Sequence, residues 1–338
     1  MTSSPLISIL VPSYNQGEYI ASTILSVLKQ NYPNWELIIQ DSNSQYNTKS
    51  ICLDYEKKDP RIKFFSEKDK GFADAVNKAI DKAKGTIAAI QSSDDFYSNE
   101  FVFSEVVEVF NKHPQLNLLA GYHSYVTKEL KEILCPQPLQ EQTNGFIEPG
   151  KLFGLQVHFP QSSTFFNLQR AREIKKLNTE LDMVADTDFW IRMANYTPVT
   201  SKSIFRVEKY WSCVIVHENQ RSVDQCQFSL GRSKMYYHYI NDDNLSVTRL
   251  IKTTAFRATL VDALGYFHAQ QRDTAELRTM FTDVFRKRLP LRWTVKEFLN
   301  ISPLFRKWLY KNNPERSSLE LLKYPKGNTA NWMIENAG

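Results

Sequence analysis

The first 120 residues alternate between short apolar runs and amphipathic segments at a regular pitch. The apolar runs at 7–11, 37–39, 62–65 and 86–90 are predicted strands, because each is short, apolar and closed by polar residues or proline. Helical spacing of apolar residues predicts helices over 19–30, 50–58, 72–84 and 101–111. This alternation predicts an α/β fold, with a parallel, doubly wound sheet that has helices on both faces.

The ends of these predicted strands are where a ligand is expected. In an open parallel sheet, ligands bind outside the carboxyl ends of the strands. The four predicted strands lead into polar segments at 13–15, 41–44, 67–71 and 92–95. We therefore expect these four segments to line one site.

The way in which this site holds phosphate is restricted by the motifs that are missing. Neither GxGxxG after the first strand nor the P-loop pattern GxxxxGK[ST] occurs. Asp94 and Asp95 instead follow the fourth predicted strand. Mg²⁺ and Mn²⁺ prefer oxygen ligands and commonly take one or two carboxylates plus substrate phosphates. The pair predicts a metal-bridged diphosphate site, and the alternative is that Asp95 caps the helix that follows.

Beyond residue 116 the pattern is mixed. Strands are predicted at 116–119 and 163–166, and a helix is predicted to begin at Asp186. After about residue 225 the sequence is helical and amphipathic to its end. This predicts one large domain over 1–225 and a C-terminal helical region over 226–338.

Composition is that of an ordinary globular protein. The chain has 338 residues, of which 42% are hydrophobic, with a net charge of +5. Its four cysteines have no regular spacing, which favours reduced thiols over a zinc site or a disulfide framework. The N-terminus lacks a basic region before its apolar run, and nowhere do 18 apolar residues run together. We therefore expect a cytoplasmic protein.

The stretch 286–311 contains eight basic residues and one acid, with Trp293 and Trp308 among them. Basic and aromatic residues in alternation are typical of an anionic membrane surface or of nucleic-acid binding. A solvated helix face is the alternative. We expect no nucleic-acid partner, and a peripheral membrane contact through 285–311.

Several of these motifs together resemble glycosyltransferase family 2. The resemblance covers about residues 5–220 and is carried by the order and spacing of its parts. These parts are Val11-Pro12-Ser13-Tyr14-Asn15-Gln16-Gly17, Asp41, Asp69-Lys70-Gly71 with Asp74, Asn77 and Lys78, Gly85, Ser92-Ser93-Asp94-Asp95, Phe165-Phe166, and Asp186-Thr187-Asp188-Phe189-Trp190-Ile191-Arg192.

The resemblance implies a GT-A fold, which has a Rossmann-like, mostly parallel sheet flanked by helices. It implies a nucleotide-sugar binding half over 1–120 and an acceptor half over 121–225, followed by the C-terminal helical appendage. It also implies an inverting enzyme that uses a nucleotide-diphospho sugar, expected to be a UDP-sugar, with Mn²⁺ or Mg²⁺.

The resemblance assigns donor binding residue by residue. The nucleotide pocket would be lined by Pro12, Tyr14 and Asn15, and the base or ribose would be contacted by Asp41. The residues along the phosphates and sugar would be Lys70, Asp74, Asn77, Ser93 and Asp94. The alternatives are that Tyr14 and Asn15 are turn residues and that Asp41 caps a helix.

The metal and the base are assigned in the same way. Asp94 and Asp95 match the acidic motif of the family, although Ser92 replaces the Asp that often opens it. His217 resembles a late histidine that approaches the metal, and its alternative is a structural role. Asp186 matches the general base, although Ala185 replaces the Glu that often precedes it. Asp186 and Asp188 could instead be acids favoured at a helix N-terminus, and this is the interpretation we prefer for Asp188.

The predicted reaction moves a sugar to a hydroxyl of a glycan or lipid-linked acceptor in cell-surface polysaccharide synthesis. Two alternatives remain open. One is a sugar-phosphate nucleotidyltransferase, but those enzymes have a Gly-rich loop after the first strand, where this chain has one glycine in 13–17. The other is a non-catalytic domain that binds a nucleotide sugar.

Overall fold

A computed structural model was analysed, and it describes residues 4–286 with gaps. The gaps are 46, 128–131, 134–143, 155–156, 200–201, 218–223, 249–250 and scattered positions between 253 and 274. The chain divides into two compact units. The first comprises 1–216 with 244–246, and the second comprises 217–243 and 247–338.

One sheet organises the first unit, in the strand order β3-β2-β1-β4-β9-β6-β10-β5, with β7 paired to β6 and β8 to β10. The strands are β1 (Ile7–Ser13), β2 (Trp35–Asp41), β3 (Ile62–Ser66), β4 (Ile87–Ile90), β5 (Asp95–Tyr97), β6 (Leu118–Val126), β7 (Glu132–Ile133), β8 (Gly145–Phe146), β9 (Thr164–Asn167) and β10 (Ile204–Ile215).

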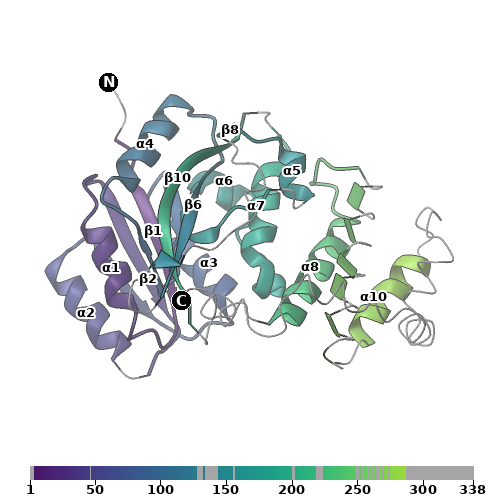
Figure 1. Cartoon of the computed structure of the whole chain (residues 1–338), viewed down its shortest axis with the longest axis horizontal. Helices are drawn as coiled ribbons and strands as arrows, with labels where there is room; N and C mark the ends of the chain where they lie inside the picture. Colours follow the sequence, from purple (N-terminus) through teal and green to yellow (C-terminus); the bar gives the residue numbers. More distant parts are fainter. Residues whose placement is uncertain are drawn as a thin grey trace. The chain divides into compact units, whose positions relative to one another are not determined.

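Helices cover both faces of this sheet, as the alternation predicts (Figure 1). The helices and 3₁₀ turns of the first unit are α1 (Ile20–Leu28), α2 (Thr48–Lys58), α3 (Phe72–Lys82), α4 (Val102–Lys112), α5 (Pro149–Phe153), η1 (Gln161–Ser163), α6 (Leu168–Glu173), η2 (Thr179–Val184) and α7 (Ala185–Asn195). One core cluster packs α1, α2 and α4 on the sheet, and the other packs α3, α6 and α7 on its opposite face.

The four N-terminal strands confirm the sequence prediction. β3, β2, β1 and β4 are neighbours and all run parallel. The residues of β1, β2 and β4 are nearly continuously buried, as expected for strands covered on both faces, whereas β3 at the edge of the sheet is buried only at Ile62. In register, Ser13 lies beside Asp41, and Asp41 lies beside Ser66, so three predicted strand ends meet at one edge.

The second half of the sheet is built differently. β9 lies antiparallel between β4 and β6, and β5 pairs antiparallel with the far end of β10. β6 starts at Leu118, two residues later than predicted, and runs to Val126. Neither β5 nor the long β10 was predicted, because the sequence of β10 mixes apolar with charged residues (IFRVEKYWSCVI) and has no clear period.

The second unit contains the helices α8 (Gln225–Tyr239) and α10 (Ala275–Arg286). The predicted membrane-contact stretch 285–311 lies almost entirely outside the described residues. Within the described part of the chain, no helix is both long and apolar enough to cross a bilayer. Cys52, Cys213 and Cys226 are free cysteines among the described residues.

Candidate active site

The loops after β1 and β2 are tied together at the carboxyl edge of the sheet. The Asn15 backbone N–H donates to Ser44 Oγ at 2.7 Å, and Asn15 Oδ1 accepts from the Gln45 backbone N–H at 2.8 Å. Asn15 has a φ of 56°, a left-handed conformation that asparagine tolerates better than most residues. Tyr14 beside it is 61% exposed. Asn15 therefore shapes the edge, while the Tyr14 ring is accessible to a ligand.

Asp41 is fully buried at the end of β2. One carboxylate oxygen accepts from the Ser44 backbone N–H and from Ser66 Oγ, both at 2.9 Å, and the other accepts from Ser44 Oγ. The next helix, α2, has Asn47 as its N-cap, so the alternative that Asp41 caps a helix is wrong. Asp41 braces the loop that presents Ser44.

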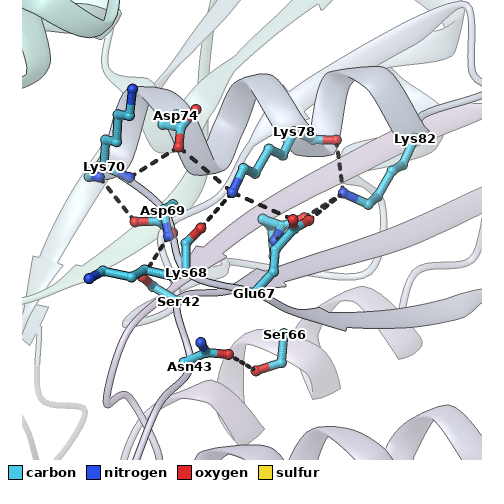
Figure 2. A network of polar contacts seen from close by, with 12 residues as sticks. Ser42, Asn43, Ser66, Glu67, Lys68, Asp69, Lys70, Asp74, Lys78 and Lys82 are labelled. Carbon is cyan, nitrogen blue, oxygen red and sulfur yellow. Dashed lines mark hydrogen bonds and ion pairs between the residues drawn. The ribbon is translucent and has the colours of Figure 1, made fainter.

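The third strand end continues into a network of charged residues along α3 (Figure 2). Lys82 lies 3.1 Å from Glu67, and Lys78 lies 3.6 Å from Glu67 and 3.7 Å from Asp74. The hydrogen bond from Lys82 is the main cause that lowers the pKa of Glu67. Asp74 also accepts from the Lys70 backbone N–H at 3.0 Å, while the Lys70 side chain extends away from the network (Figure 2). The network holds the loop 67–71 on α3.

The acid pair after β4 is firmly held. Asp95 opens β5 and is only 6% exposed, whereas Asp94 is partly exposed. Thr23 on α1 donates to the Asp95 backbone carbonyl at 2.7 Å. The helix that follows begins later, with Phe101 as its N-cap. The alternative in which Asp95 caps that helix is therefore wrong.

Burial is the main cause that raises the pKa of Asp95, and the neighbouring charge of Asp94 raises it further. Hydrogen bonds from the Ile215 backbone and from Ser92 oppose that rise. Ser92 Oγ also accepts from Gln161 Nε2 at 3.0 Å. The serine that departs from the family motif thus links the acid pair to η1.

These residues fit a divalent cation. Two adjacent carboxylates, one of them deeply buried, repel each other, and a cation between them relieves that repulsion. Among the described residues, no three His, Cys, Asp or Glu side chains gather as a metal cluster. Mn²⁺ or Mg²⁺ on Asp94 and Asp95 would therefore complete its coordination with donor phosphates or water.

Asp186 lies in the first turn of α7 and is partly exposed. Burial is the main cause that raises its pKa, and bonds from Thr187 and the charge of His158 oppose this. Burial lowers the pKa of His158, and the charge of Asp186 opposes that shift. A carboxylate with a raised pKa and remaining solvent access suits a general base.

Asp188, two residues on, is in a different situation. It is 1% exposed, and its carboxylate lies 2.6 Å from Arg192 Nη2 and 2.8 Å from Arg192 Nε. The same guanidinium donates to the backbone carbonyls of Ile174 and Lys176. Asp188 is therefore part of a buried structural pair, in agreement with the preference for a non-catalytic role.

The other predicted site residues are placed as follows. Pro12 and Ser93 lie at the same carboxyl edge, in β1 and immediately before Asp94. Asn77 lies on α3, and both ends of its amide are bonded to the Leu177 backbone at 2.9 Å. His217 is the first residue of the second unit. The roles of these residues in donor and metal binding stay predictions.

Sequence reasoning missed His158, Gln161 and Arg206. Arg206 is buried, stacks on the Phe159 ring at 4.9 Å, and donates to the His158 backbone carbonyl. Nothing in the local pattern of residues 157–161 marks them as neighbours of Asp186 or Ser92. The only signal was their type, a histidine and a glutamine just before a predicted strand.

A parallel half-sheet with acids at its carboxyl edge, extended by a mixed half-sheet, defines a protein of the GT-A class. Solved structures support this fold. The chain matches a Staphylococcus aureus TarS structure in complex with UDP-GlcNAc at a TM-score of 0.58, with 16% identity over 87% of this chain and 78% of that one. It matches a Pyrobaculum calidifontis mannosyltransferase in complex with GDP-Man and Mn²⁺ at a TM-score of 0.57, with 14% identity over 96% and 88%.

The chain belongs to glycosyl transferase family 2, and it is a glycosyltransferase. The family model matches residues 8–174. The glycosyltransferase GlyG of Streptococcus pneumoniae is 33% identical over 80% of this chain and 99% of its own length. The predicted nucleotidyltransferase alternative is therefore wrong.

Shorter matches are closer in sequence. A teichuronic acid biosynthesis glycosyltransferase of Bacillus subtilis is 43% identical, over 28% of this chain and 38% of its own length. An Escherichia coli UDP-Glc:α-D-GlcNAc-diphosphoundecaprenol β-1,3-glucosyltransferase is 44% identical, over 27% of this chain and 36% of its own length. The chain thus spans well under half of these two relatives.

Proposed function

We propose that the protein transfers a sugar from a UDP-sugar, with inversion, to a hydroxyl of a glycan or lipid-linked acceptor in cell-surface polysaccharide synthesis. The observation that carries this proposal is the arrangement of three acids. Asp94 and Asp95 follow β4 at the donor edge, and Asp186 begins a helix of the acceptor half. This supplies a metal-binding pair and a separate base.

The reaction is a single displacement. The acceptor oxygen attacks the anomeric carbon from the face opposite the diphosphate, and Asp186 takes the proton of that hydroxyl. The new carbon–oxygen bond forms as the bond to the diphosphate oxygen breaks, and the nucleoside diphosphate leaves with the electron pair. Asp94 and Asp95 would hold a divalent cation, which would act as a Lewis acid for the charge that develops on the leaving group.

Similarity to named proteins supports the donor and the acceptor class. The name of the Bacillus relative refers to teichuronic acid, and that of the Escherichia relative refers to UDP-Glc and a GlcNAc-diphosphoundecaprenol acceptor. One solved neighbour binds UDP-GlcNAc, and another binds GDP-Man. We therefore place UDP-glucose and UDP-GlcNAc first among donors, with GDP-mannose as the comparison.

Thermal unfolding with Mn²⁺ and each of these three nucleotide sugars tests the donor. The cognate donor is expected to raise the melting temperature most, because a ligand that binds only the folded state stabilises it by about 2.7 kcal/mol at 100 times its Kd. Release of nucleoside diphosphate from that donor then distinguishes an enzyme from a binding domain. Equal shifts for all three donors would contradict a dedicated donor site.

We also propose that the protein works at the inner face of the membrane, where a lipid-linked acceptor would present its sugar. The support is the charge of 286–311, with eight basic residues against one acid. Liposomes with anionic lipids are expected to bind the full chain, and binding should weaken as salt rises because exposed charges are screened over about 8 Å at physiological ionic strength. Equal binding to neutral liposomes would overturn this.

A further inference from the structure

The chain that leads into Asp186 runs along α3 from one end to the other. Arg172 donates to the Ile80 and Ala83 carbonyls at the C-terminal end of α3, at 3.0 and 2.6 Å. The Leu177 backbone N–H donates to the Asn77 side chain in the middle of α3, and the Asp182 carboxylate accepts from the Ala73 backbone N–H at the N-terminal end of α3. We call this contact, between residues 172–182 and α3, the α3 seam.

Asn77 uses both the oxygen and the nitrogen of its side-chain amide in the α3 seam. Its Oδ1 accepts from the Leu177 backbone N–H, and its Nδ2 donates to the Leu177 carbonyl, each at 2.9 Å. An amide side chain offers a donor and an acceptor at once. A carboxylate at this position would face the carbonyl oxygen without a proton to donate. The identity of residue 77 is therefore explained by the seam, without any contact to a donor.

Asp182 caps α3 from 109 positions away in the chain. Its Oδ1 accepts from the Ala73 backbone N–H at 3.0 Å, and N–H groups in the first turn have no partner within the helix. Gly71, the N-cap residue, has no side chain to fill that role. A negative charge at this end is also favoured by the helix dipole.

The same carboxylate limits what the donor loop 67–71 can contain. A Cβ on Gly71 would lie 3.0 Å from both Asp182 carboxylate oxygens, and the φ of +121° is itself unfavourable for other residues. Lys70 precedes this glycine, and Asp74 follows it on α3 (Figure 2). One acid of the acceptor half thus packs directly against the loop predicted to hold the donor.

The seam also determines where Asp186 lies. η2, which contains Asp182, runs directly into α7, and Asp186 is in the first turn of that helix. Asp188, in the same first turn, forms a buried pair with Arg192, whose guanidinium is bonded to the carbonyls of Ile174 and Lys176. The start of α7 is therefore anchored from both sides to the segment that docks on α3.

We propose that Asn77 and Asp182 are positioning residues, which set the distance between the donor loop 67–71 and the base Asp186 without contacting donor. This rests on the proposed function and deepens it. The reason they matter is geometric, since a misplacement of about 1 Å between reacting groups costs about 10²-fold in rate. It gives Asn77 a role different from the donor contact predicted from the family resemblance.

The test compares Asn77→Ala and Asp182→Ala with Asp182→Asn, which keeps the oxygen that accepts from Ala73. The two alanine variants are expected to lower kcat by about 10- to 100-fold, with the donor KM and the affinity for UDP changed less than about threefold, as when only transition-state geometry is lost. Asp182→Asn is expected to restore most of kcat. Loss of UDP affinity in Asn77→Ala with kcat unchanged would support a donor contact and overturn the proposal.

Asp81→Ala is the matched control. It removes the 2.5 Å ion pair with Lys176 at the same seam, but the Asp81 side chain is 61% exposed. Exposed pairs contribute little, so kcat should stay at the wild-type value. Melting temperatures of all variants show whether they fold, and Asn77→Ala provides the answer if Asp182→Ala does not fold.

A double variant separates positioning from a general structural role. If Asp182 acts through Asp186, adding Asp182→Ala to Asp186→Asn should cause no further loss of kcat, because residues that act as a unit are not additive. Multiplicative losses would overturn the proposal. If Asp186→Asn is inactive while both alanine variants keep normal turnover, the proposal is overturned but the proposed function is not. Normal turnover in Asp186→Asn would overturn the base assignment in the proposed function, and the proposal with it.

Discussion

Asp188 and Asp186 are two residues apart on one helix, yet their carboxylates differ in burial and in bonding partners. Asp188 is 1% exposed and fully engaged by Arg192, whose guanidinium also bonds two backbone carbonyls. Asp186 is partly exposed, accepts hydrogen bonds from Thr187 and from its own backbone, and has its pKa raised by burial. The first has the surroundings of a structural acid, and the second those of a reactive one.

The donor edge repeats this contrast over a longer distance. Asp41 is buried and holds Ser44 and Ser66. Asp95 is nearly as buried, but it lies beside the like charge of Asp94 and its pKa is raised. An acid whose charge is satisfied by protein groups stabilises the fold, whereas one left partly uncompensated is available to a cation or a proton. We therefore expect substitutions of the partly uncompensated acids to affect turnover, and substitutions of the satisfied acids to affect stability or binding.

The largest effect is expected at the acid pair. Removal of divalent ions by EDTA, or substitution of Asp94 or Asp95 by alanine, should lower turnover by about 10³-fold or more, because Lewis-acid stabilisation of a leaving diphosphate is worth several kcal/mol. Nucleoside diphosphate release measures this. Asp54→Ala, at a 65% exposed acid on α2, is the control and should leave turnover unchanged. Turnover that survives EDTA would contradict the metal assignment.

Asp186→Asn and Asp188→Asn should separate catalysis from stability. The first should lower kcat by about 10²- to 10⁴-fold with a nearly constant donor KM, since a general base contributes in that range. It should also raise the free energy of unfolding by about 0.5–2 kcal/mol, because a charge that is costly to bury is removed. Asp188→Asn should instead destabilise the protein by up to about 3–5 kcal/mol, the cost of breaking a buried pair.

Chemical denaturation and steady-state kinetics on the same two variants provide these measurements. If Asp188→Asn were inactive at full stability while Asp186→Asn kept its kcat, the two assignments would have to be exchanged.

A smaller effect is expected where the acid is satisfied. Asp41→Ala should weaken UDP binding by about 1–3 kcal/mol, the range for losing a hydrogen bond to a charged group. Asp41 would affect UDP binding through Ser44, which connects Asp41 to Asn15. Ser44→Ala should therefore show part of the same loss of UDP affinity. Titration with UDP measures both affinities. An unchanged affinity in Asp41→Ala would remove Asp41 from the nucleotide site.

The dependence on pH should be the most gradual effect. The pKa of Asp186 is raised in the folded protein, so kcat should fall about tenfold per pH unit below that raised pKa, at a higher pH than the ordinary aspartate value of about 3.9. Stability changes in the opposite direction. The folded state binds this proton more tightly than the unfolded state, so the stability from protonated Asp186 is complete below the ordinary value and is lost as pH rises through the raised one.

Kinetics across pH, with unfolding followed at the same pH values, check both halves of this prediction. An acid limb of kcat at the ordinary aspartate pKa would contradict it.

The N-terminal half of the sheet could be predicted because its structure is local. Each of the strands β1, β2 and β3 is followed within a few residues by a helix, so hydrophobic periodicity shows both elements and the direction of the strand. A parallel sheet then brings Ser13, Asp41 and Ser66 to one edge by register. The positions of Asp41 at the end of β2 and of the acid pair after β4 follow from this arrangement.

The second half of the sheet and the segments packed on it depend on contacts between distant parts of the chain. Asp182 caps α3 across 109 positions, and Gln161 bonds Ser92 across 69. β9 lies antiparallel between β4 and β6, and β5 pairs with β10 more than a hundred residues later. A pattern read along the sequence reports which face of an element is apolar, and it carries no information on which distant polar group will meet that element's ends. Those pairings arise only when the elements pack, because a buried N–H or carboxylate must then find a partner.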